Sequence, residues 1–159
     1  MSDEQQVDIA GAELASEVVH DGRLVLLVFL VRSETGNSLE LGAWSNTTAG
    51  KLAPPPRPLV FSIGTLDRLR ALAEHAVEAL PGASYVEDGM AVLARDGELA
   101  ATAMRASDGT HWVSLGWADD TGLATVPAAG IGSFVRVLAE AERELMELGL
   151  LAFPNELQN

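Results

Sequence analysis

The sequence has no cysteine, a single lysine and few aromatic residues, and each shortage narrows the possible functions. Without cysteine, neither a disulfide framework nor a thiolate metal site can form. Aromatic residues make up only 5% of the chain, so Leu, Val and Ala must fill most of the core. The chain has ten basic and 23 acidic residues, which give a net charge of −13. Such a charge repels polyanions at long range, although a local basic strip can still act inside that field.

Long hydrophobic runs are also absent. The longest apolar run covers residues 24–31, far short of the ~20 residues that span a bilayer. Residues 1–8 are polar and acidic, which does not fit the basic and apolar pattern of a signal peptide. These features predict a cytoplasmic protein with no membrane partner.

Two similar segments, residues 57–80 and 121–149, each combine a strand, a glycine-marked corner and an amphipathic helix. Ile63-Gly64 in the first copy recurs as Ile131-Gly132 in the second. We therefore predict an α+β protein made of two duplicated ββββα units, each with an antiparallel sheet and one long helix. The predicted parts are an acidic tail (1–12), two units fused into one domain (13–82 and 83–149) and an apolar C-terminal tail (150–159).

Turn signals and apolar periodicity place the elements. Asp-Gly pairs separate short strands at the spacing of an antiparallel meander. The predicted strands are residues 13–20, 23–32, 38–45 and 59–63 in the first unit, and 90–95, 98–106, 110–118 and 121–128 in the second. The strand at 23–32 is apolar on both sides of the pleat, which predicts one face under a helix and the other against a second subunit. Thr65 and Ser133 are the expected helix N-caps.

The segments VFSIGTLDRLRAL (residues 60–72) and 111–148 resemble the strand-to-helix corners of the Whirly and positive-cofactor-four type of single-stranded DNA-binding fold. The lysine-rich motif of plant Whirly proteins has no counterpart, because Lys51 is the single lysine. The segment VPAAGIGSFVRVL (residues 126–138) is also similar to SsgA-like proteins, actinobacterial sporulation and cell-division factors that act through protein contacts. Both resemblances imply a homo-oligomer.

Aromatic and basic residues on strands are the candidates for nucleic-acid binding, since bases stack on aromatic faces and phosphates follow basic groups. Trp44 shares a strand face with Glu40 and Gly42, and Trp112 shares one with Ser114 and Gly116. The basic candidates are Arg23, Arg32, Lys51, Arg57, Arg95 and Arg105. Alternatively, the tryptophans pack under the proline-rich segment or at a subunit interface, and the arginines only solubilise strand ends.

Catalytic and metal-binding patterns are weak. The three histidines lack the HExxH pattern and any nucleophile elbow. His75 lies between Glu74 and Glu78, a spacing more typical of a solvated helix face than of a metal site. The AAGIGS corner offers backbone N–H groups to a phosphate, but a plain strand-to-helix turn explains it as well. The PPPRP segment is either a ligand for a proline-binding groove or a stiff loop. We expect no enzyme activity, no metal and no cofactor.

Two functions remain. The first is a non-catalytic regulator that binds single-stranded nucleic acid through Trp44, Trp112 and the strand arginines. The second is an acidic protein-interaction or scaffold module of SsgA-like character that binds no nucleic acid. The first predicts that the arginines converge on one face, and the second predicts that acidic residues separate them.

Overall fold

The computed structural model describes residues 12–19, 22–46, 50–86 and 88–151. It is an α+β fold with two antiparallel sheets and two long helices, each helix following a set of strands, as duplicated ββββα units require. The predicted N-terminal tail, apart from residue 12, and the C-terminal tail beyond residue 151 lie outside the described residues. No helix in the described part of the chain is long and apolar enough to cross a bilayer.

The first sheet, called sheet A here, is a meander in which β1 pairs with β2 and β2 with β3, and both β4 and β5 pair with β3. Its strands are β1 (Ala12–Val19), β2 (Leu24–Ser33), β3 (Gly36–Asn46), β4 (Leu52–Ala53) and β5 (Leu59–Ser62). The two-residue strand β4 lies just before the PPPRP segment (residues 54–58) and was not predicted. The other four strands match the prediction.

The second sheet, sheet B, runs β6-β7-β8-β9 with every neighbouring pair antiparallel. Its strands are β6 (Met90–Asp96), β7 (Leu99–Arg105), β8 (His111–Trp117) and β9 (Leu123–Pro127). Glycines with positive φ stand at the turns, including Gly97 and Gly109. An Asp-Gly turn accepts this conformation at no steric cost, which is why the meander could be predicted.

The helices are α2 (Leu66–Ala79) and α3 (Gly132–Glu147), and no side chain caps the first turn of either. A short 3₁₀ turn, Ile63–Thr65 or Ala128–Gly130, leads into each helix. The Thr65 side chain makes no capping bond and instead pairs with the Ser62 hydroxyl at 2.8 Å. Ser133 lies inside α3, buried, where it accepts a hydrogen bond from Arg136. Thr65 therefore stands at the predicted N-cap position of α2 without capping it, and the predicted cap at Ser133 is wrong, because Ile131 is the N-cap of α3.

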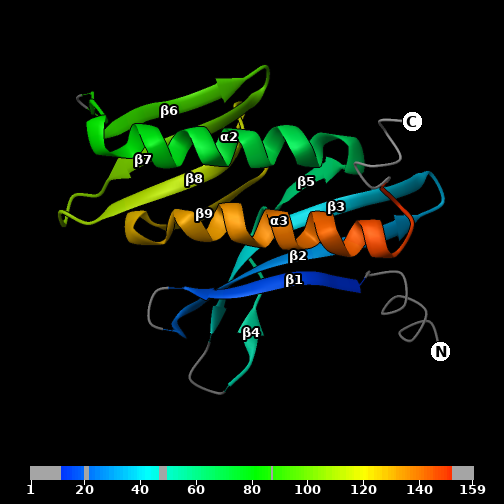
Figure 1. The fold of residues 1–159 in the computed structure, drawn as a ribbon. Helices are drawn as coiled ribbons and strands as arrows, with labels where there is room; N and C mark the ends of the chain where they lie inside the picture. Colours follow the sequence, from blue (N-terminus) through cyan, green and yellow to red (C-terminus); the bar gives the residue numbers. More distant parts are fainter. Residues whose placement is uncertain (1–11, 20–21, 47–49, 87, 152–159) are drawn as a thin grey trace.

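Each helix packs mainly on the sheet of the other half of the chain. Helix α2 contacts β6 and β7, whereas α3 contacts β1 and β2, and the two helices touch each other. Figure 1 shows them side by side in front of the sheets. Leu69 and Leu72 of α2 and Phe134 and Leu138 of α3 join one continuous core. The two halves thus share one core.

Arginine–carboxylate pairs connect the layers. Arg136 of α3 reaches Glu17 of β1, with 2.6 Å between Nη2 and Oε2, and Arg68 at the start of α2 pairs with Asp96 at 3.1 Å. Hydrogen bonding from Arg136 lowers the pKa of Glu17. These contacts hold α3 to sheet A and α2 to sheet B.

Candidate functional site

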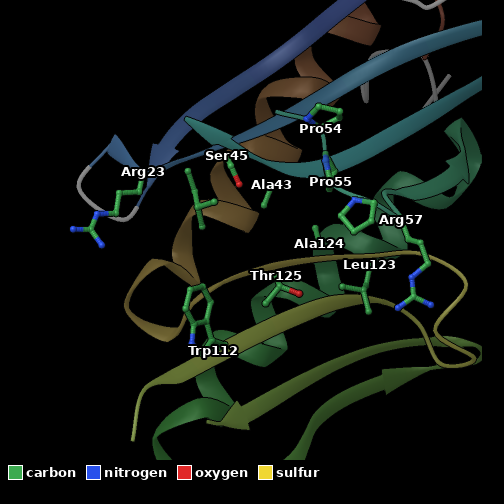
Figure 2. A pocket seen from close by; sticks show the side chains of 12 residues that line it. Arg23, Ala43, Ser45, Pro54, Pro55, Arg57, Trp112, Leu123, Ala124 and Thr125 are labelled. Carbon is green, nitrogen blue, oxygen red and sulfur yellow. The ribbon is translucent and has the colours of Figure 1, made fainter. Parts of the chain in front are cut away.

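A cleft of about 480 Å³ opens where the edge of sheet A meets β9 (Figure 2). One wall comes from sheet A and the segment between β4 and β5, and the other from β8 and β9. We call it the inter-sheet cleft. It is lined by Arg23, Leu24, Ala43, Ser45, Pro54, Pro55, Pro56, Arg57, Trp112, Leu123, Ala124 and Thr125. Its volume lies in the range of roughly 300–1,000 Å³ typical of small-ligand pockets.

The proline wall rests on Gly42, a residue of β3 without a side chain. A Cβ placed on Gly42 would lie 2.8 Å from Cγ of Pro55 and 3.5 Å from Cβ of Pro58. The prolines hold an extended path without needing ladder hydrogen bonds. Gly42 therefore lets a stiff segment lie close against the sheet and form one side of the cleft.

Trp112 enters the cleft from the opposite side, on β8 (Figure 2). It is half-buried and lies between Met104 and Pro127 in the strand register. Its indole Nε1 donates to the Thr110 hydroxyl at 3.0 Å, and that hydroxyl donates to Asp108 at 2.6 Å. The bonds from Thr110 lower the pKa of Asp108, which keeps this carboxylate charged. This chain of bonds fixes the indole orientation in advance of any ligand.

Arg57 stands at the other end of the cleft and belongs to the junction of the two sheets. Its Nη1 donates to the Asp120 carbonyl at 3.0 Å, while its own carbonyl accepts from the Leu123 N–H at 3.0 Å. Asp120 has a positive φ of 63°, which no other non-glycine residue in the described part of the chain has. The guanidinium is thus held at the cleft mouth, and its remaining N–H groups face solvent because the residue is exposed.

A second hollow of about 330 Å³ adjoins the first on the outer face of sheet B, the face away from the helices. Arg57 and Leu123 line both hollows, and Arg95 and Met104 line the second. Three of the predicted basic residues, Arg23, Arg57 and Arg95, therefore lie along one continuous depression.

The other predicted binding residues lie elsewhere. Arg32 lies near the end of β2, at the β2–β3 hairpin, and Arg105 stacks over the Tyr85 ring at 5.2 Å. Lys51 is exposed next to β4. Trp44 lies on the outer face of sheet A, where its ring is 5.7 Å from Phe29. The structure thus brings Arg23, Arg57 and Trp112 together in the cleft and leaves Arg32, Lys51, Trp44 and Arg105 outside it.

Acidic residues avoid the cleft despite the net charge of −13. None of the described residues that line it is acidic. The helix arginines Arg68, Arg70, Arg136 and Arg143 are all ion-paired, whereas no ion pair involves Arg23 in the described part of the chain. Arg23, Arg57 and Arg95 therefore place positive charge at the cleft and its extension, the latter also lined by Asp120. Arg32 and Arg105, which form no ion pair in the described part of the chain either, lie outside both hollows.

Sequence reasoning missed the apolar lining of the cleft, including Leu123 and Thr125. The proline run was visible, but nothing in it indicates that it forms the wall of a pocket with β9. None of the described residues lining the cleft is His, Asp, Glu or Lys, and its hydroxyl groups come from Ser45 and Thr125. No group of three or more His, Asp or Glu side chains able to hold a metal occurs among residues the structure describes. What the arrangement can do is sandwich a flat apolar ring near Trp112 and place anionic groups beside Arg23 and Arg57.

Comparison with known proteins adds little to this geometry. No protein-family model matches the chain, and no curated protein matches it. Among solved structures, the chain is similar to a chain from the Trypanosoma bruciei MRP1/MRP2 crystal structures, with a TM-score of 0.36 and 12% identity. The match covers 93% of this chain and 96% of that one.

Proposed function

We propose that the protein is a non-catalytic, cytoplasmic regulator that binds single-stranded nucleic acid in the inter-sheet cleft. The observation that carries the proposal is the meeting of Trp112 with Arg23 and Arg57 around an acid-free apolar cleft. A base needs an aromatic face, and its phosphates need cations near that face. The cleft supplies both.

The energetics of base stacking on Trp112 favour a single strand over a duplex. Stacking of one base on an aromatic side chain contributes roughly 1–3 kcal/mol, and it is open only to a base that is not already stacked in a duplex. Arg23 and Arg57 supply charge-assisted bonds to phosphate, and Arg95 extends the cationic path onto sheet B. Because phosphate contacts release counterions, affinity should fall as salt rises. The net charge of −13 opposes binding at low salt, and salt screens this repulsion.

The test is fluorescence anisotropy of a labelled single-stranded oligonucleotide titrated with the full chain at several salt concentrations. Arg23→Ala should weaken binding and reduce the salt slope by about 0.7, the value for one phosphate contact on a single strand. Arg32→Ala is the matched control, because it removes the same charge from another exposed strand end outside the cleft. Equal effects of the two substitutions, or no binding at low salt, would refute the proposal.

A further inference from the structure

A second surface lies on the outer face of sheet A, next to the place where Pro55 packs over Gly42. Strand β2 is apolar on both sides: Leu26, Val28 and Leu30 enter the core, and the residues between them point the other way. Leu27 is only 4% exposed, yet it lies outside the core cluster. The strand pairings place the side chains of Val18, Val25, Leu27, Phe29, Val31, Trp44 and Val60 on this face, away from the core.

The apolar residues of this face do not cover one another completely. Val18 is 64% exposed and Val60 is 47% exposed, on either side of the tilted Phe29–Trp44 pair. Large apolar side chains concentrated on one sheet face are typical of an interaction surface, whereas single exposed ones are ordinary. No described helix covers this face, because α2 and α3 both lie on the opposite side (Figure 1). Pro55 and Pro58 pack on it over Gly42, opposite Leu27, and leave Val18 and Val60 exposed.

Carboxylates flank the centre of the face. Phe29 lies opposite Glu13 of β1 on one side and opposite Glu40 of β3 on the other. Glu40 in turn lies opposite Val60 of β5. Glu40 is half-buried and forms no ion pair in the described part of the chain. Burial of this carboxyl among apolar neighbours raises its pKa, as expected for a charge that lacks a partner.

We propose that the outer face of sheet A docks a peptide segment of a partner protein that presents a Lys or Arg between apolar side chains. The apolar residues of the segment would cover Phe29, Trp44 and Val60, and its cation would lie between the two carboxylates. Charge complementarity selects this occupant, because a half-buried carboxylate becomes favourable only when a cation or hydrogen-bond donor reaches it.

A second copy of this chain fits the face less well. It would bring the same two carboxylates and a net charge of −13 to an already acidic surface. Nucleic acid is repelled for the same reason. The face is therefore suited to a basic and apolar protein segment, and its use does not depend on the inter-sheet cleft.

The experiment is selection of a random peptide library displayed on phage against the immobilised full chain. Enriched peptides are then synthesised, and their affinities are measured by isothermal calorimetry. We expect enriched peptides to carry Lys or Arg flanked by apolar residues. Their affinity should fall about tenfold with Glu40→Gln, because the buried charge pair is lost, and with Val60→Ser, which removes apolar contact. Trp112→Ala, a cleft substitution, should leave it unchanged.

Three results would overturn the inference. One is the absence of enriched peptides, and another is enriched peptides that bind the Glu40→Gln chain as tightly as the original. The third comes from sedimentation: a self-associating chain that becomes monomeric with Val60→Lys would assign this face to a second copy. Thermal melts of each variant distinguish lost binding from lost folding. None of these results bears on nucleic-acid binding at the cleft.

Discussion

Pro55 packs directly over the missing side chain of Gly42, so that a Cβ at position 42 would come within 2.8 Å of the proline ring. This contact joins β3 to the segment that forms one wall of the inter-sheet cleft. Because Gly42 has no Cβ, the proline segment can lie against β3 and form a wall of a cleft whose opposite side comes from β8 and β9.

Gly42→Ala should therefore displace the proline wall and weaken oligonucleotide binding. A Cβ that close forces the rigid ring to move, at a cost of about 1–3 kcal/mol of packing energy. Anisotropy titration and a urea melt of the variant measure the two effects. Gly82→Ala is the control, because a Cβ there meets nothing within 4 Å. Unchanged binding by Gly42→Ala would show that the wall does not shape the site.

Gly116→Ala should destabilise the fold itself. A Cβ at this position in β8 would lie 2.6 Å from Cβ of Leu123 and also meet the carbonyl oxygen of Gly122. Because part of this clash involves backbone, we expect a loss of about 1–3 kcal/mol in the free energy of unfolding. Gly64→Ala, where the nearest atom lies at 4.0 Å, should cost little by comparison. Equilibrium urea unfolding of both variants makes the comparison.

Glu17→Gln should lower stability at neutral pH by about 0.5–1 kcal/mol, since the Arg136 side chain is largely exposed. The pKa of Glu17 is lowered in the folded state, mainly by hydrogen bonding to Arg136. Its contribution is therefore present above the ordinary value of 4.5 and is lost as pH falls through the folded-state pKa. Thermal melts from neutral to acid pH should show the two chains converging. A difference that persists at the acid end would mean that the ion pair is not its source.

Glu40→Gln should have the opposite effect on stability. Burial raises the pKa of Glu40, so its charged form opposes folding. The stabilising contribution of the protonated form is complete below the ordinary value of 4.5 and is lost as pH rises through the folded-state pKa. The variant should thus melt a few degrees higher than the original chain near pH 7 and at the same temperature in acid. A lower melting temperature at pH 7 would indicate that Glu40 has a stabilising partner.

Local patterns predicted most of the fold. The Asp-Gly turns and alternation at residues 38–45 and 90–128 placed the strands, and apolar steps of three and four placed the helices. The packing of each helix on the opposite sheet was not predictable, because an amphipathic stripe shows that a helix is buried without showing against which partner. Thr65 holds the predicted position before α2 but bonds to Ser62, and Ser133 lies inside α3, because these residue types also serve in 3₁₀ turns and buried hydrogen bonds.

The candidate site was predictable as a list of residue types but not as a place. Trp44 and Trp112 both occupy outward strand positions, and alternation alone cannot separate them. Only the tertiary structure directs Trp112 into a cleft with Arg23 and packs Trp44 against Phe29. The contact between β3 and β9 that creates the cleft depends on how the sheets cross, which no local pattern encodes.

Fluorescence of Trp112 tests nucleic-acid binding in the cleft most directly. Trp44→Phe with Trp117→Phe leaves Trp112 as the single tryptophan of the chain. We predict that an unlabelled single strand quenches its emission as a base stacks on the indole, with the same midpoint as the anisotropy titration and with reversal by salt. If the oligonucleotide binds while the emission of Trp112 stays unchanged, or if it does not bind at all, the cleft is not a nucleic-acid site.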